Sequence, residues 1–144
     1  MINDDTIQLL RECNSGVKMG VISLDDVLRH VHDENLEKRL YACKQAHESL
    51  GDETHDILNE YHDTGKEPKP MEKGMSWLKT NVQLAMNDSD KTIADLITDG
   101  CNMGVKSLSR YLNQYKAASE KAKDIAKRLI NLEERLVVDL RAYL

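Results

Sequence analysis

The sequence predicts an all-α protein that folds as a four-helix bundle made of two similar helical hairpins. Three observations predict this fold class. Apolar residues recur at steps of three and four along four long segments, the spacing of one face of a helix. Pro occurs twice and Gly seven times in 144 residues, too few for a β protein rich in turns. One short segment occurs twice, at matching places in the two halves of the chain.

The length of the chain fits one domain, residues 1–144, large enough to bury a core without disulfides. Phe is absent and aromatic residues make up only 4%, so the core has to be built from Leu, Ile, Val, Met and Ala. We therefore expect a single bundle with an aliphatic interior.

The first hairpin is expected at about residues 4–64. Its first helix has an apolar stripe interrupted by Asn14, and the second opens at Asp33 and Glu34, whose charges favour a helix N-terminus. The second helix is expected to stop at Gly65, because the segment 65–70 contains two prolines and cannot continue a helix. The two stripes are Ile7, Leu10, Val17, Val21, Leu24, Leu28 and Val31, then Leu36, Leu40, Cys43, His47, Leu50, Thr54, Ile57 and Tyr61.

A crossover is expected at residues 65–89, with a short amphipathic helix. Trp77 and Leu84 lie off its apolar stripe, so this helix has a second apolar side. Since Trp is enriched at interface hot spots, we expect a homodimer through Trp77 and Leu84; the alternative is that Trp77 fills the end of the bundle.

The second hairpin is expected at about residues 90–144. A polar cluster at residues 87–90 predicts a turn and a helix cap, and Ser119 is expected to cap the last helix. The stripes are Ile93, Ile97, Cys101, Gly104, Leu108, Tyr111 and Tyr115, then Ile125, Leu129, Leu132, Leu136, Leu140 and Tyr143.

The repeated segment covers residues 13–18 and 101–106, which agree at five of six positions. We interpret it as the trace of a duplicated hairpin, with Asn14 and Asn102 as buried polar residues. Gly inside a helix costs about 0.8–1 kcal/mol relative to Ala, so glycines spaced by four predict a close approach to the backbone. That approach is either tight helix packing or room for a ligand. The glycines are Gly16, Gly20, Gly100 and Gly104.

Several short motifs resemble an uncharacterised bacterial family of ferritin-like four-helix-bundle domains of unknown function. They are Leu9-Leu10, Cys13-Asn14-x-Gly16, the segment 65–68 after the second helix, and the segment 99–104 with Tyr111. The resemblance implies a ferritin-like fold with a crossover between the hairpins. It implies no activity, because the family has none established.

The residues do not supply a di-iron site. Such a site takes a Glu from each of two helices and a Glu-x-x-His from each of the others. Here the duplicated segments carry Asn14 and Asn102, and no His follows residue 62. A weaker metal hypothesis rests on Cys43 and His47, four residues apart on one stripe, with Cys13, Cys101 and Glu133 as further ligands. The alternative is that the thiols are small buried hydrophobes and His47 is a hydrogen-bonded core residue.

Charge and composition exclude several classes of function. The net charge of −5, without a basic run, argues against nucleic-acid binding, and no apolar stretch could span a membrane. The first five residues are acidic where a signal peptide would be basic, and three cysteines are an odd set, so we expect a cytoplasmic protein with reduced thiols.

No catalytic or cofactor-binding motif is present in the sequence. We therefore expect a non-enzymatic helical bundle without a cofactor that acts through protein–protein contact, chiefly self-association. The alternative is a ferritin-like metal-binding or redox protein with a non-standard site in the bundle core.

Overall fold

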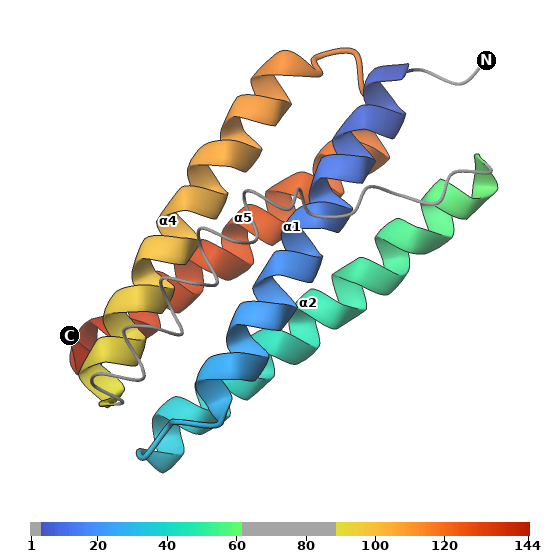
Figure 1. Cartoon of the computed structure of the whole chain (residues 1–144). Coiled ribbons are helices and arrows are strands. Elements are labelled where there is room, and N and C mark those ends of the chain that lie inside the picture. Colours follow the sequence, from blue (N-terminus) through green and yellow to red (C-terminus); the bar gives the residue numbers. More distant parts are fainter. Residues whose placement is uncertain (1–3, 62–88) are drawn as a thin grey trace.

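The computed structural model describes residues 4–61 and 89–144, and these residues form four long helices (Figure 1). They are α1 (Asp4–Leu28), α2 (Glu34–Glu60), α4 (Asp90–Gln114) and α5 (Glu120–Leu140), followed by a short 3₁₀ helix, η1 (Arg141–Tyr143). No strand occurs among the described residues, so the predicted all-α class and the four long helices are confirmed. The expected crossover helix, with Trp77 and Leu84, lies outside the described residues.

Three helices begin at side-chain caps. Asp33 accepts a hydrogen bond from the backbone N–H of Leu36 at the start of α2. Ser89 and Ser119 do the same for α4 and α5, as the sequence predicted. These caps satisfy N–H groups that have no partner within the helix. The predicted end of α2 at Gly65 is wrong, because α2 ends at Glu60. The backbone N–H of Tyr61, the C-cap residue, donates a hydrogen bond of 3.0 Å to the backbone O of Leu58.

Hydrogen bonds between turns fix the direction of each helix. The carboxylate of Asp90, at the start of α4, accepts from the backbone N–H groups of His32 and Asp33 in the turn between α1 and α2. At the other end, the N–H of Ser119 donates to Thr6 Oγ1, and Tyr61 packs into the same apolar cluster as this turn. Hence α2 and α4 run in the same direction, and the chain between residues 61 and 89 joins opposite ends of the bundle (Figure 1).

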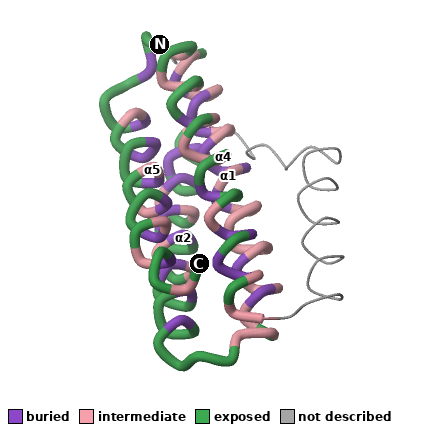
Figure 2. The backbone as a smooth tube through the Cα atoms, turned by 90° about the vertical axis from the view of Figure 1, so that its left-hand side faces the viewer, coloured by how far each residue is buried: buried purple, intermediate pink, exposed green. Residues whose placement is uncertain are grey.

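The core consists of two apolar clusters, one towards each end of the bundle. All four long helices contribute to both clusters, so the described residues form one domain. Figure 2 shows buried residues recurring along each helix. The first cluster contains Leu9, Leu10, Cys13, Val17, Leu50, Ile57, Leu58, Leu108, Ala118, Ala122, Ile125, Ala126 and Leu129. The second contains Leu24, Val27, Leu36, Leu40, Cys43, Ile93, Ala94, Leu96, Ile97, Cys101, Leu136 and Leu140.

The bundle is flattened across one diagonal. Helix α1 packs closely on α2, α5 packs closely on α4, and α1 and α5 also touch each other across the bundle. Helices α1 and α4, although neighbours, share the smallest of these helix–helix interfaces. The α1–α4 edge is therefore the least tightly closed side of the bundle.

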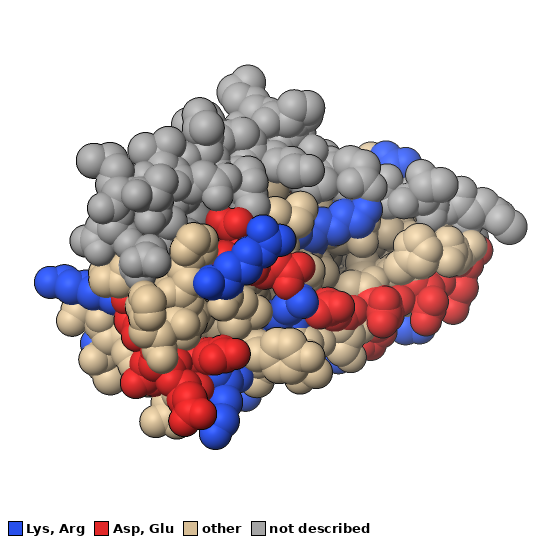
Figure 3. Space-filling view, turned by 60° about the horizontal axis from the view of Figure 1, so that its bottom comes forward, with Lys and Arg blue, Asp and Glu red and all other residues tan. Residues whose placement is uncertain are grey.

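Acidic and basic side chains are interspersed on one face of the described residues (Figure 3). The best-formed ion pair joins Arg128 on α5 to both carboxylate oxygens of Glu53 on α2, at 2.9 and 2.8 Å. Exposed pairs of this kind contribute about 0–1 kcal/mol each, so they are secondary to the apolar core. Among the described helices, none is long and apolar enough to cross a membrane.

Replacement of Asp90 tests the contact between the two hairpins. We expect Asp90→Ala to lower the free energy of unfolding by about 1–2 kcal/mol, because two backbone N–H groups lose a charged acceptor. Urea denaturation measures the loss. The matched control is Asp95→Ala, which removes an exposed carboxylate from the same helix and should leave stability unchanged or slightly raised. Equal losses in both variants would contradict this role for Asp90.

Candidate functional site

A polar layer separates the two apolar clusters. We use this name for four residues, one from each long helix: Gly20, His47, Gly104 and Glu133. Each lies between two buried residues of its own helix at core spacing, so each occupies a position where an aliphatic side chain would normally pack. The flanking residues are Val17 and Leu24, Cys43 and Leu50, Cys101 and Leu108, and Leu129 and Leu136.

The two functional side chains of this layer meet inside the bundle. The Nε2 atom of His47 lies 3.8 Å from Oε1 of Glu133, and their side chains are only 2% and 10% exposed. The other ring nitrogen, Nδ1, lies 2.8 Å from the backbone O of Cys43 and 3.5 Å from its Sγ. A carbonyl oxygen can only accept a hydrogen bond, so Nδ1 carries a proton and donates it. Nε2 is thus left facing Glu133.

Both members of the pair have raised pKa values. Burial alone would lower the pKa of His47, but its contacts with Cys43 and Glu133 outweigh burial and raise that pKa to about 10. Burial also raises the pKa of Glu133, and the neighbouring His47 opposes that rise. Both shifts favour retention of one proton between the two groups at neutral pH, which leaves the pair without net charge.

Two glycines make room for the pair. A Cβ atom on Gly20 would lie 2.8 Å from Cδ2 and 3.0 Å from Nε2 of His47, and one on Gly104 would lie 2.9 Å from Cδ of Glu133. All three distances are too short for ordinary contact. The predicted close approach at these two positions is therefore made by polar side chains, each coming from the other helix of the same hairpin.

The remaining glycines differ from one another. Gly16 makes an ordinary helix–helix contact, with a Cβ position 3.6 Å from Cδ2 of Leu129. The prediction of close packing at Gly100 is wrong, because no described atom lies within 4 Å of a Cβ placed there. The sequence analysis also missed Gly51, where a Cβ would lie 2.9 Å from Cγ1 of Val17. That glycine, isolated in sequence, lets α1 and α2 approach.

A cavity of about 390 Å³ opens beside the polar layer, between α1 and α4. His47 and Glu133 both line it, and Nε2 of His47 and Oε2 of Glu133 have no hydrogen-bond partner among the described residues. Buried polar atoms without a partner are costly, so these two atoms mark a place where a bound molecule would be stabilised. The apolar part of the lining consists of Met19, Leu24, Ile97, Met103, Leu108 and Leu136.

The predicted metal ligands are only partly brought together. Cys43 and Cys101 lie close enough to the pair to interact with it electrostatically, and Cys101 also lines the cavity. Burial raises the pKa of Cys101, and Glu133 raises it further. Cys13 lies in the first apolar cluster instead, where burial raises its thiol pKa to about 12. Across residues 4–61 and 89–144, no group of three or more His, Cys, Asp or Glu side chains is placed to hold a metal ion.

The two asparagines of the repeat have different surroundings. Asn14 is buried as predicted, at 4% exposure. The prediction for Asn102 is wrong, because this residue is exposed. Helix α1 contacts α2, α4 and α5, and so buries a broad face, whereas α4 contacts mainly α5 and α1. Position 102 falls outside the narrower buried face of α4.

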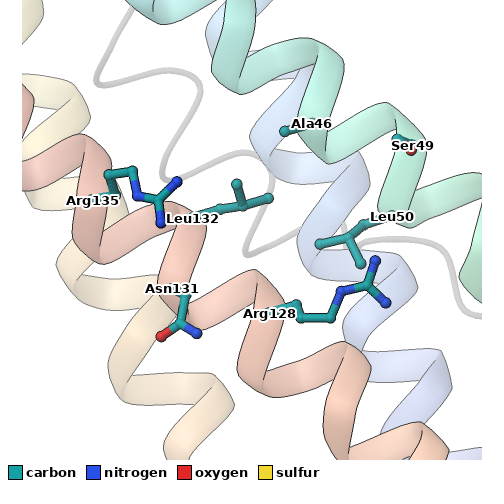
Figure 4. Close-up of a pocket in the computed structure, with 7 residues that line it drawn as sticks. All are labelled: Ala46, Ser49, Leu50, Arg128, Asn131, Leu132 and Arg135. Carbon is teal, nitrogen blue, oxygen red and sulfur yellow. The ribbon is translucent and has the colours of Figure 1, made fainter.

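A second depression, of about 360 Å³, lies between α2 and α5 (Figure 4). Ala46, Ser49 and Leu50 line it from α2, and Arg128, Asn131, Leu132 and Arg135 line it from α5. Arg128 is already engaged by Glu53, and none of the described buried polar atoms that lack a partner lies here. The cavity beside the polar layer is therefore the better candidate site.

Comparisons of the chain with protein-family models, curated proteins and solved structures found no match. The candidate site accordingly rests on the geometry of the described residues. The resemblance to ferritin-like domains stays a prediction.

Alanine substitution tests the two kinds of glycine. We expect Gly20→Ala to lower the free energy of unfolding by about 1–3 kcal/mol, because the new methyl group would overlap the buried ring of His47. Gly100→Ala is the matched control and should raise stability by up to about 1 kcal/mol through helix propensity. Thermal and urea denaturation measure both. A stabilised Gly20→Ala variant would show that the ring is not held against α1.

The shared proton predicts a pH-dependent stability. The folded pKa of His47 is raised above its ordinary value of 6.5, so its contribution is complete below pH 6.5 and is lost as pH rises towards about 10. The raised pKa of Glu133 acts in the same direction, because the folded chain keeps a proton that the unfolded chain releases.

We therefore expect the free energy of unfolding to fall by about 1.4 kcal/mol per pH unit between pH 6.5 and 8.5, where unfolded thiols are still protonated. Urea denaturation across this range gives the slope. His47→Gln should flatten it, whereas His55→Gln, which replaces an exposed histidine of the same helix, should not. A slope that survives in His47→Gln would assign the proton to another group.

Proposed function

We propose that this protein is a non-enzymatic binding protein that holds a small molecule in the cavity between α1 and α4. The observation that carries this proposal is the pair of buried, unpartnered atoms, His47 Nε2 and Glu133 Oε2, at the wall of that cavity. A volume of about 390 Å³ falls at the small end of the range for ligand pockets, about 300–1,000 Å³. Apolar walls with a few convergent polar groups are typical of such pockets.

Two further features favour binding over catalysis. Burial keeps the thiols of Cys13 and Cys101 protonated, and a protonated thiol is a poor nucleophile. The Nε2 of His47 faces a carboxylate rather than a Ser, Thr or Cys side chain that it could activate. The site thus supports recognition by hydrogen bonds and apolar contact.

For the fold, we propose a ferritin-like bundle derived from a duplicated hairpin. The parallel direction of α2 and α4 supports this, since a ferritin-like connection runs the length of the bundle. The similar positions of Cys13 in α1 and Cys101 in α4 support it as well. A cytoplasmic location and self-association through Trp77 and Leu84 remain predictions from the sequence.

A panel of six-carbon probes tests the binding function. We expect at least one of 1-hexanol, hexylammonium chloride and sodium hexanoate to bind saturably, shifting the backbone amide NMR signals of residues around Gly20 and Gly104. Ser107→Leu, which places a larger side chain in the cavity wall, should weaken binding at least tenfold.

The control is Ser109→Leu, the same substitution at an exposed position of α4 outside the lining, which should bind like the unmodified protein. Absence of saturable binding by all three probes would contradict the proposed function. So would equal binding by the two leucine variants.

A further inference from the structure

We infer that the ligand of this cavity is an organic cation, an ammonium group on a small apolar body, and that the ammonium donates hydrogen bonds to His47 Nε2 and Glu133 Oε2, the two buried atoms without a partner among the described residues. This inference rests on the proposed function and names the chemical class of the ligand. The hydrogen-bonding roles of the two side chains, the charge of the lining and the balance of protons all favour this class of ligand.

His47 and Glu133 both present hydrogen-bond acceptors to a ligand. Because Nδ1 of His47 donates to the backbone O of Cys43, a neutral ring presents only an acceptor at Nε2. Ionised Glu133 also presents only acceptors. An ammonium group has three N–H donors and no acceptor, so it can donate to Nε2 and to Oε2 at once. A hydroxyl has a single proton, and a carboxylate has none.

The charge of the lining favours the same class. Its ionisable residues are Glu12 on α1, His47 on α2, Cys101 and Tyr111 on α4, and Glu133 on α5, and the described lining contains no Lys or Arg. Cys43, also on α2, lies on the Nδ1 side of the His47 ring, with its Sγ 3.5 Å from Nδ1. The buried carboxyl group of Glu133, in a described lining without Lys or Arg, favours a cation over an anion beside the polar layer.

Exchange of one proton for one ammonium ion keeps the site without net charge. The empty site holds Glu133, His47 and one proton, and has no net charge. When an alkylammonium ion enters, that proton leaves to solvent, Glu133 is ionised and His47 is neutral. The loaded site again has no net charge, so no uncompensated charge is buried. No covalent bond forms or breaks except that to the exchanged proton.

The glycines and walls fix the orientation. Gly20 and Gly104 line the cavity beside His47 and Glu133, and any larger residue at either glycine would collide with these side chains. The apolar residues Ile97, Leu108 and Leu136 line the same cavity and would contact an alkyl body. The ammonium therefore points to the polar layer and the alkyl body lies along α4.

Calorimetry with the three six-carbon probes tests the inference. At pH 8 we expect hexylammonium chloride to bind at least tenfold more tightly than 1-hexanol, with sodium hexanoate weakest. Titrations in two buffers of different ionisation enthalpy should show about one proton released for each hexylammonium bound. Its affinity should rise about tenfold per pH unit between pH 7 and 9, because fewer protons then compete for the pair.

Glu133→Gln keeps the shape of the side chain and removes its charge. It should weaken hexylammonium binding at least thirtyfold, and at least tenfold more than it weakens 1-hexanol binding. The control Glu134→Gln, at the adjacent exposed position, should leave both unchanged. If Glu133→Gln does not fold, the number of protons released by the unmodified protein decides instead.

The outcomes separate the two proposals. Tighter binding of 1-hexanol or sodium hexanoate, or binding of hexylammonium without proton release, would overturn the cation inference while leaving the cavity as a binding site. Saturable binding of zinc chloride with none of the organic probes would overturn it in favour of a metal. If no probe binds and the cavity holds water alone, the proposed function fails together with the inference.

Discussion

The contact between His47 and Glu133 constrains the rest of this bundle. Two large polar side chains occupy core positions, so the apolar core cannot run unbroken from end to end and is divided into two clusters. Neither side chain could stay buried with an uncompensated charge. The shared proton removes that difficulty, and the hydrogen bond from Nδ1 to Cys43 O holds the ring in place.

Accommodating the pair determines the packing around it. The side chains need space on the facing helices, and Gly20 and Gly104 provide it at the expense of helix propensity. The polar layer borders the α1–α4 interface, which is the least closely packed of these helix–helix interfaces. Part of the space beside the layer therefore stays open as a cavity. The buried polar atoms and the cavity thus occur together because the His47–Glu133 pair prevents the helices from packing closely at this level.

This arrangement favours the proposed binding pocket over the metal site considered from the sequence. Cys43, His47, Cys101 and Glu133 are neighbours, but no three such side chains among the described residues are placed to hold a metal ion. Nε2 of His47 and Oε2 of Glu133 are buried without a hydrogen-bond partner among the described residues, and both residues line the cavity. We propose that this pair binds a group with several N–H donors in preference to a metal ion.

The helices and most of their caps could be predicted from the sequence, because apolar periodicity and the side chains of Ser89 and Ser119 act locally. The sequence also singled out His47 and Glu133 as candidates, since both interrupt or flank an apolar stripe. Which of these groups meet could not be predicted, because it depends on how the helices pack against one another. The rotation of α4 exposes Asn102, the position of α5 places Glu133 against Gly104, and Cys13 falls in another cluster. These outcomes depend on how far each helix turns about its own axis, which is set by packing against its neighbours and not by any residue's local preference.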